Sequence, residues 1–328
     1  MSHDETPNTS ICLRPLPTQL LQSTLSVSSP FIWVALLSAA TLGMVTVLDK
    51  RLASKDMPSL AAFYMGTLIS LFGYATVALA ISGIPDNISM DRLMAAIISG
   101  LFWGGALAMM FLGYKFEEAS RASAIIHTFP VFVAVLAVGV LGETLVSGQW
   151  IAIISVVAGA FIISLRTADG GGIVRLTRAF PILITASLLT ALALLTGKYA
   201  LEELPVWFVY SLRSYGMVLV FVFLWRPGAF GELFRAVRNW RTFLLLFLAE
   251  FSLAPLAVLL NVAAISLGPV SLVATLTATR PIFVFVYGTI LSMPALKLLD
   301  EPLDRTTLAV KLVAIIMVVG GIIALTVL

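Results

Sequence analysis

Long apolar runs separated by short polar breaks constrain this chain more than any other feature. Between Glu117 and Ser164, two runs long enough to cross a hydrocarbon layer of ~30 Å are joined by a short break at 141–144. The first run contains Pro130 deep inside it. The chain is 60% hydrophobic and 11% charged, whereas soluble domains carry about 25% charged residues. We therefore expect most of the chain to lie in lipid.

Ten apolar segments are candidate membrane spans. Backbone groups cannot remain unpaired in lipid, so each span should be helical; a closed barrel would instead need alternating strands, which the sequence does not show. The spans are expected at 30–47, 58–81, 93–114, 119–141, 148–165, 179–195, 205–225, 243–267, 269–293 and 307–328.

The pattern at 117–164 has a weaker copy near the C-terminus. Pro281 follows Pro130 by 151 residues, and Glu301 follows Glu143 by 158 residues, so the second copy has about seven extra residues near 293–299. Because five spans per copy is an odd number, the second copy enters the membrane from the opposite side. We predict an all-α integral membrane protein with ten transmembrane helices arranged as two inverted five-helix repeats.

The domain boundaries follow from this repeat. Residues 1–29 are polar and rich in Ser, Thr and Pro, and they lack the basic start and apolar core of a signal peptide. We expect a disordered tail at 1–29, a first repeat at 30–166, a linker at 167–178 that contains three consecutive glycines, and a second repeat at 179–328.

The distribution of basic residues predicts an orientation. The connections on one side of the expected bundle carry fourteen Lys or Arg residues, and the side with both termini carries three. Cytoplasmic loops of membrane proteins are enriched in Lys and Arg, so this count places both termini outside the cytoplasm.

Four ionisable residues lie near mid-span: His127, Arg213, Glu250 and Arg280. Such residues cost roughly 2.5 kcal/mol or more unless they face a cavity or a partner. Glu250 and Arg280 could form a structural ion pair or a solute site. Arg280 precedes the helix-breaking Pro281 and offers a planar fork for a carboxylate. Glu250 could accept an ammonium group or carry a coupling proton, so the pair would suit a zwitterion such as an amino acid.

The remaining candidates have weaker signals. His127 would titrate near physiological pH if solvent reaches it, but a lone histidine in an apolar helix is commonly a packing residue. Trp103 is a candidate wall for the solute, or a packing residue among small neighbours. Arg213 is expected to bond helix-end carbonyls or a neighbouring helix, with a substrate contact as the alternative. Glu143 and Glu301 are interpreted as structural loop residues near helix ends.

Several classes of function are disfavoured. The sequence contains no HExxH, GxxxxGK[ST] or GxSxG motif, so we expect no enzyme. A single cysteine, Cys12, and two histidines leave no basis for a metal site, and we expect no cofactor. The net charge of +3 comes from residues spread among short loops, so we expect no nucleic-acid partner.

These residues together resemble the EamA family of the drug/metabolite transporter superfamily. The resemblance covers roughly residues 30–328. Its motifs are Ala119-Ser120-Arg121-Ala122-Ser123, Phe129-Pro130-Val131-Phe132, Leu141-Gly142-Glu143, Gln149-Trp150 and Gly159 in the first copy, and Pro269-Val270-Ser271, Pro281, Leu299-Asp300-Glu301 and Gly320-Gly321 in the second.

The resemblance implies a gradient-driven secondary carrier that uses alternating access to export a small organic metabolite such as an amino acid. Its expected cavity is walled by helices 1, 3, 4, 6, 8 and 9, and the expected substrate-binding residues are Glu250, Arg280, His127 and Trp103. Its expected partners are a small-molecule substrate and the lipid bilayer of the plasma (inner) membrane, with a homodimer left open.

Three alternatives remain open. The same fold could carry a sugar phosphate or nucleotide-type solute, or the protein could be a membrane sensor or scaffold that transports nothing. The resemblance also implies cytoplasmic termini, which is the reverse of the charge count.

Overall fold

The computed structural model describes residues 30–86, 88–141, 147–167, 174–267, 273, 276–293, 299 and 304–327. The expected tail at 1–29, Glu143, Glu301 and most of the proposed insertion lie outside the described residues, as do 168–173 of the expected linker.

The first half contains α2 (Pro30–Arg51), the π-helix η1 (Leu52–Asp56), α3 (Leu60–Ser82), α4 (Met90–Gly113), α5 (Ala119–Ile126), α6 (Phe129–Leu141) and α7 (Ser147–Ser164). The strands β1 (Leu165–Thr167) and β2 (Val174–Leu176) follow. The second half contains α8 (Ala179–Leu201), α9 (Val206–Phe223), α10 (Ala229–Val237), α11 (Trp240–Leu246), the π-helix η2 (Phe247–Leu253), α12 (Ala254–Leu267), α14 (Arg280–Ser292) and α15 (Arg305–Val327).

Apolar helices make up nearly the whole described fold. Within the described residues, eight helices are long and apolar enough to cross a membrane, and two shorter apolar helices lie at Ser147–Ala160 and Arg280–Ser292. Each of the ten expected segments therefore contains apolar helix, as an all-α membrane protein requires. The division into two five-helix repeats remains a prediction at this point.

One expected boundary was wrong, and two connections contain secondary structure that was not expected. The first helix does not end at residue 47 but continues through η1 to Asp56, because no glycine or proline follows Gly43 until Pro58. The connection at 226–241 contains the short helix α10. The ends of the linker pair as an antiparallel two-stranded ribbon, with Leu165 opposite Leu176.

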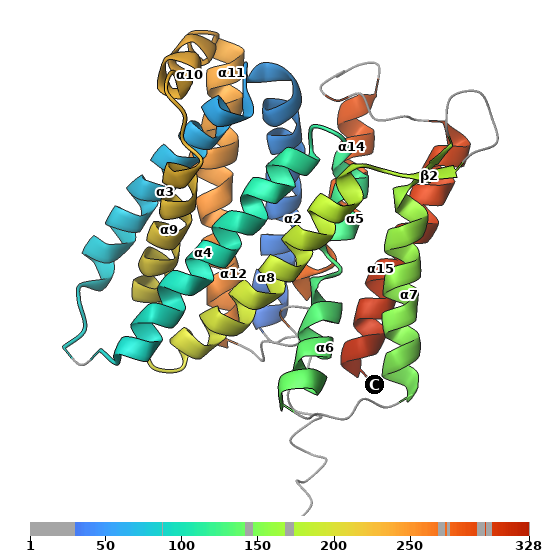
Figure 1. Cartoon of the computed structure of the whole chain (residues 1–328), viewed down its shortest axis with the longest axis horizontal. Coiled ribbons are helices and arrows are strands. Elements are labelled where there is room, and N and C mark those ends of the chain that lie inside the picture. The colour runs from blue at the N-terminus through green and yellow to red at the C-terminus, as the bar shows by residue number, and fades with distance from the viewer. Residues whose placement is uncertain are drawn as a thin grey trace, which may run out of the picture.

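Helices from different halves of the chain pack side by side. Figure 1 shows α4 running alongside α8 and α7 alongside α15, and both pairs are in close contact. The pairs α3–α9 and α2–α12 are also extensive. The bundle is therefore built from contacts between the halves, and any cavity at its centre is lined by both.

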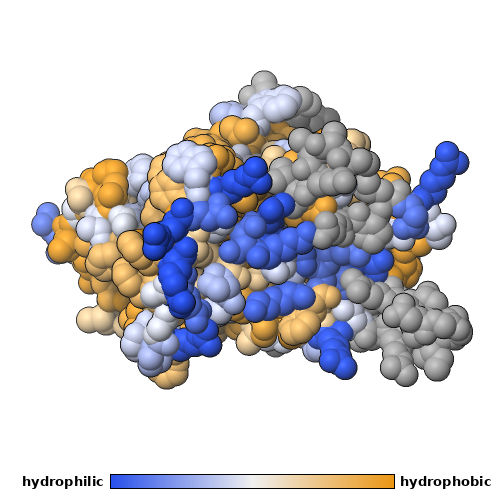
Figure 2. Space-filling view, turned by 90° about the horizontal axis from the view of Figure 1, so that it is seen from above, coloured by the Kyte–Doolittle hydropathy of each residue, from blue (hydrophilic) through white to orange (hydrophobic). Residues whose placement is uncertain are grey.

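The end of the bundle near α10 and α11 contains part of an extensive apolar core. Buried residues from η1, α10 and α11, including Leu52, Leu233 and Leu246, belong to this core. It continues into an aromatic cluster in which the rings of Phe63 and Phe111 lie 4.7 Å apart. Figure 2 shows this end from above, where hydrophilic side chains gather along the middle of the face. The same end carries α10, α11 and the β1–β2 ribbon (Figure 1).

The helix α10 is attached to the start of α3. The Ser59 hydroxyl caps α3 by accepting a hydrogen bond from the Ala62 N–H at 3.1 Å, and it donates to the Glu232 carboxylate. Arg226 also donates to this carboxylate, at 2.8 Å. The hydrogen bonds from Ser59 and Arg226 hold the pKa of Glu232 below its ordinary value. Glu232 is therefore ionised at neutral pH, when it accepts hydrogen bonds from both Ser59 and Arg226.

Candidate functional site

Two prolines break helices at the centre of the bundle in the same way. Proline has no N–H, and its ring clashes with the carbonyl four residues earlier. Before Pro130, the Thr128 hydroxyl donates to the Ile125 carbonyl at 2.8 Å. Before Pro281, the Thr279 hydroxyl donates to the Leu276 carbonyl at 2.6 Å. In each break, the threonine hydroxyl thus bonds the carbonyl five residues before the proline, so the two breaks have the same local side-chain bond.

The backbone bonds at the two breaks also correspond. The Thr128 N–H bonds to the Ile125 carbonyl and the Thr279 N–H to the Leu276 carbonyl, both at 3.2 Å. The residue after each proline bonds back to the threonine carbonyl, at 2.9 Å in the first break and 3.0 Å in the second. Equivalent positions are separated by 151 residues, the offset between the two prolines. Residues 129 and 280, which follow the threonines, both line the central cavity.

A third distortion brings Glu250 into the same region. Glu250 lies in η2, a π-helical stretch within an otherwise α-helical span, and Pro255 follows five residues later. Because Pro255 has no N–H, backbone carbonyls one turn earlier lose a partner. Ser70 donates to the Glu250 carbonyl and Tyr74 to the Phe251 carbonyl, both from α3. Single-turn π-helices of this kind occur frequently at functional sites.

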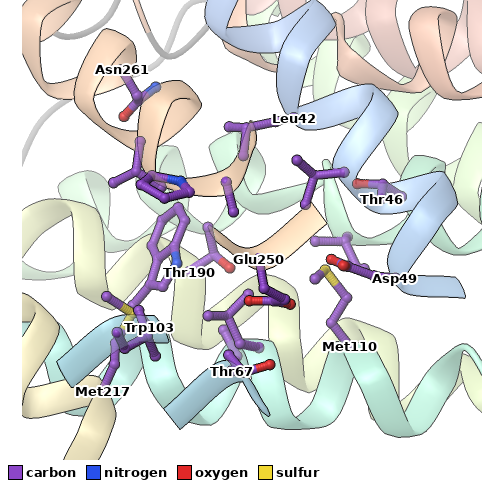
Figure 3. Close-up of a pocket in the computed structure, with 18 of the residues that line it drawn as sticks. Leu42, Thr46, Asp49, Thr67, Trp103, Met110, Thr190, Met217, Glu250 and Asn261 are labelled. Atoms are coloured by element: carbon purple, nitrogen blue, oxygen red, sulfur yellow. The ribbon is translucent and has the colours of Figure 1, made fainter. Parts of the chain in front are cut away.

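These distortions surround a cavity of about 120 Å³. The four residues singled out from the sequence, Trp103, His127, Glu250 and Arg280, all line it, and so does Asp49. Glu250 is 5% exposed and Asp49 is 3% exposed. Figure 3 shows the Asp49 and Glu250 carboxyl groups facing one another across the cavity, from α2 and η2 respectively.

The wall around these charged residues is broader than the resemblance implied. The expected set of helices 1, 3, 4, 6, 8 and 9 contributes through α2, α4, the α5–α6 break, α8, α12 and the start of α14. Helices 2 and 7 contribute as well, with Thr67 on α3 and Ser214 on α9. The helices α3 and α9 also pack against each other.

Several polar atoms of the cavity wall have no hydrogen-bond partner among the residues that the structure describes. They are Oδ1 of Asp49, Oγ1 of Thr67, Oγ of Ser214 and Nε of Arg280, all of them buried. Native interiors leave few buried polar atoms unpaired, and each one requires an explanation, such as a ligand or water. These atoms are therefore available to form hydrogen bonds with a polar molecule in the cavity.

Arg213 and His127 have identifiable structural partners. The Arg213 guanidinium lies 4.3 Å from the ring centroid of Trp103, a cation–π distance, so Arg213 fixes the orientation of the tryptophan at the cavity wall. Nδ1 of His127 donates to the Ser123 carbonyl at 2.7 Å, which leaves Nε2 of the neutral ring as an acceptor. As expected, Arg213 contacts a neighbouring helix.

Asp49 was missed by the sequence reasoning because the first helix was expected to end at residue 47. The available signal was the absence of any helix-stopping residue before Pro58, which places Asp49 inside the span. Pro255, five residues after Glu250, was a second unused signal because it resembles the prolines at the other two breaks.

A separate buried charge cluster joins α15 to α5 outside the cavity lining. The Lys311 side chain is 1% exposed, and its Nζ lies 2.7 Å from Oε2 of Glu118. The same oxygen is 3.2 Å from Nε of Arg121. Lys311 lies within the last apolar helix, α15, and Glu118 supplies a partner for its buried charge.

Replacing Lys311 with methionine is expected to destabilise the protein by about 1–3 kcal/mol, because Glu118, whose side chain is only 15% exposed, loses a cationic neighbour. Thermal unfolding of the detergent-purified protein measures this. Lys115→Met is the matched control, because Lys115 is exposed and surface substitutions usually change stability by about 0.5 kcal/mol or less. Equal melting of the two variants would contradict a stabilising role for the buried pair.

Comparison with known proteins agrees with the motifs of the first half. The model of the EamA-like transporter family matches residues 29–165. Among solved structures, the crystal structure of a protein aligns with a TM-score of 0.55 over 91% of this chain and 96% of its own, at 16% sequence identity. That likeness concerns the fold alone. No curated protein sequence matches the chain. Residues 29–165 are therefore similar to the EamA-like transporter family, as the motifs of that stretch indicated.

Proposed function

We propose that this protein is a secondary active transporter that exports a small zwitterionic metabolite, with amino acids as the best-fitting class. The coarser statement, a multi-pass membrane protein of a transporter family, follows from the family match and the apolar helices. One observation supports the proposal of a zwitterionic cargo: the guanidinium of Arg280 and the carboxyl groups of Asp49 and Glu250 line the same small cavity. A zwitterion presents the opposite arrangement of charges.

Each end of such a solute has a chemically suited partner. The Arg280 guanidinium offers a planar fork that matches a carboxylate, and its buried Nε is unpaired among the described residues. The carboxyl groups of Glu250 and Asp49 can accept hydrogen bonds from an ammonium group. Trp103, held by Arg213, supplies an apolar wall for the remainder of the solute. His127 adds a hydrogen-bond acceptor to the wall.

The proposed mechanism is alternating access between two inverted five-helix repeats. The corresponding bonds at Pro130 and Pro281 support this arrangement. The helix packing supports it too, because exchanging the halves maps α3–α9 and α7–α15 onto themselves and α4–α8 onto α12–α2. Substrate sites of inverted-repeat carriers lie near the midplane, beside broken helices. The apolar core near α10 and α11 fits a carrier whose cavity is sealed on that side.

The basic face supports an orientation in the plasma membrane. We propose that the end shown in Figure 2 faces the cytoplasm, since the connections there carry most of the basic residues. Both termini then lie outside. The opposite insertion, which the family resemblance implied, would place this basic end outside the cell.

Two other functions fit the cavity less well. A sugar phosphate or nucleotide carries several negative charges. The two carboxyl groups that line the cavity would repel such a solute, and one lining arginine would attract it. A scaffold or sensor has no need for unpaired polar atoms around a central cavity, such as those of Asp49 and Arg280.

A competition experiment on reconstituted protein tests the proposal. Proteoliposomes loaded with a mixture of unlabelled amino acids are assayed for exchange with labelled leucine, isopentylamine, 4-methylpentanoate and glucose 6-phosphate, and thermal shifts are measured with each. We expect exchange and stabilisation to be strongest for zwitterions. Stronger exchange of the phosphate would favour the alternative cargo, and a lack of exchange for every amino acid would contradict the proposal.

A further inference from the structure

Asp49 and Glu250 bring two carboxyl groups together from helices that are distant in sequence. Asp49 lies near the end of α2 and Glu250 lies in η2, and these two elements are in contact. Both side chains are buried, and both line the cavity. Their carboxyl groups point toward one another, with Thr67 beside Glu250 (Figure 3).

The charge around this pair is unbalanced. Arg280 supplies one positive charge at the cavity wall. Two unpaired atoms, Oδ1 of Asp49 and Oγ1 of Thr67, are buried beside the pair without a partner among the described residues. Two fully ionised carboxylates and one guanidinium would leave one negative charge without a counter-charge in a low-dielectric cavity.

Among the residues that the structure describes, the other basic groups near the pair have contacts elsewhere or lie on neighbouring elements. Arg213 is stacked on Trp103, and Nδ1 of His127 donates to a carbonyl. Lys50, next to Asp49, donates to the backbone carbonyl of Tyr114. The remaining titratable groups on or beside the elements that pack against α2 and η2 include the phenols of Tyr64, Tyr74, Tyr114 and Tyr287. The charged groups are Arg51, which pairs with Asp56, Arg121, which pairs with Glu118, and the side chains of Lys55 and Arg241.

Two carboxyl groups that face one another inside a protein cannot both ionise readily, and such pairs commonly hold one proton between them. The titration then belongs to the pair and not to either residue. With one shared proton, the pair carries a single negative charge, which Arg280 balances. This arrangement also gives the unpaired Oδ1 of Asp49 a use as donor or acceptor of the shared hydrogen bond.

We propose that Asp49 and Glu250 share one proton when the carrier is empty, and that the ammonium group of the solute takes the place of this proton as the cation held by the pair. The proton leaves the pair for water on the side to which the cavity opens, and the loaded site then carries one net negative charge, because the carboxylate of the solute binds at Arg280. The pair holds one cation at a time, so proton entry and solute export compete for the same two carboxyl groups. The solute half of this inference rests on the proposed function, and the shared proton does not.

Infrared spectroscopy of the full-length protein in lipid tests the shared proton without any solute. We expect the carbonyl-stretching band of a protonated carboxylic acid at neutral pH, and we expect both Asp49→Asn and Glu250→Gln to remove it, since the remaining carboxylate then ionises beside Arg280. Asp86→Asn, which changes an exposed carboxyl group, should leave the band in place. A wild-type protein without the band, or a band that survives Asp49→Asn, would overturn the proposal.

Isotope labelling gives the same answer without substitutions that could impair folding. Wild-type protein is prepared with a heavy isotope at the side-chain carboxyl carbon of either aspartate or glutamate. A shared proton predicts that the protonated-acid band shifts with both labels, and a shift with the glutamate label alone would exclude sharing. If the band behaves as expected while no amino acid is exchanged in proteoliposomes, the carboxyl pair stands and the proposed cargo fails.

Discussion

Substituting Gly100 with alanine is expected to remove most folded protein, because Gly100 lies where α4 and α9 cross with their backbones almost in contact. A Cβ atom at this position would lie 2.1 Å from the Arg213 carbonyl oxygen and 2.8 Å from Cα of Gly216. Both neighbours are backbone atoms, so no side chain can rotate away. The helices would have to separate, which should cost more than the ~1–3 kcal/mol typical of overpacked cores.

The measurement is the yield and monodispersity of detergent-extracted protein, followed by thermal unfolding of whatever remains. Gly73→Ala is the matched control, because a Cβ at this helical position of α3 would meet nothing within 4 Å. Alanine there should be neutral or stabilising by up to about 1 kcal/mol. A Gly100→Ala protein that melts with the wild type would show that the crossing is looser than described.

The consequences of the crossing extend to the cavity. Arg213, whose carbonyl meets Gly100, also stacks on Trp103. Small residues allow close approach of helices in membranes, where packing replaces the hydrophobic effect as the source of association. The position of the tryptophan wall therefore depends on a glycine that does not contact the cavity.

Much of the fold was predictable because lipid leaves the backbone few choices. Apolar runs of membrane-spanning length must be helical, and all ten expected segments contain helix. The placement of Glu250 and Arg280 at one cavity was predictable for a related reason: buried charge requires a cavity or a partner. The sequence could not show whether a given charged residue faces a cavity or a charged partner. In the structure, Lys311 has a partner, whereas Arg280 lines the cavity.

The missed features depend on local backbone geometry. Asp49 appeared to lie beyond the end of the first helix, although α2 and η1 continue past it to Asp56. The π-helix at Glu250 arises because Ser70 and Tyr74 of another helix bond the carbonyls that Pro255 leaves free. Such compensation between helices is invisible to a pattern of hydrophobicity along one segment.

The largest functional effects are expected at Arg280 and Glu250. Arg280→Ala should reduce amino-acid exchange in proteoliposomes by about 30-fold or more, because truncating one partner of a buried, hydrogen-bonded charge pair costs at least about 2 kcal/mol of binding free energy and each 1.4 kcal/mol is tenfold. Glu250→Gln should also abolish flux, since it removes a proposed acceptor for the ammonium group. Both proteins should remain folded, which size-exclusion chromatography and helical circular dichroism would check.

Matched surface substitutions separate a site effect from a general loss of charge. Arg178 and Glu202 are exposed, so Arg178→Ala and Glu202→Gln should retain wild-type flux. Unchanged flux in both Arg280→Ala and Glu250→Gln would remove these residues from the site. The double variant adds a test of the charge balance: with Arg280 absent, loss of the Glu250 carboxyl relieves repulsion at Asp49. The double variant should therefore lose less unfolding free energy than the sum of the losses in the two single variants. This non-additivity is expected of groups in contact.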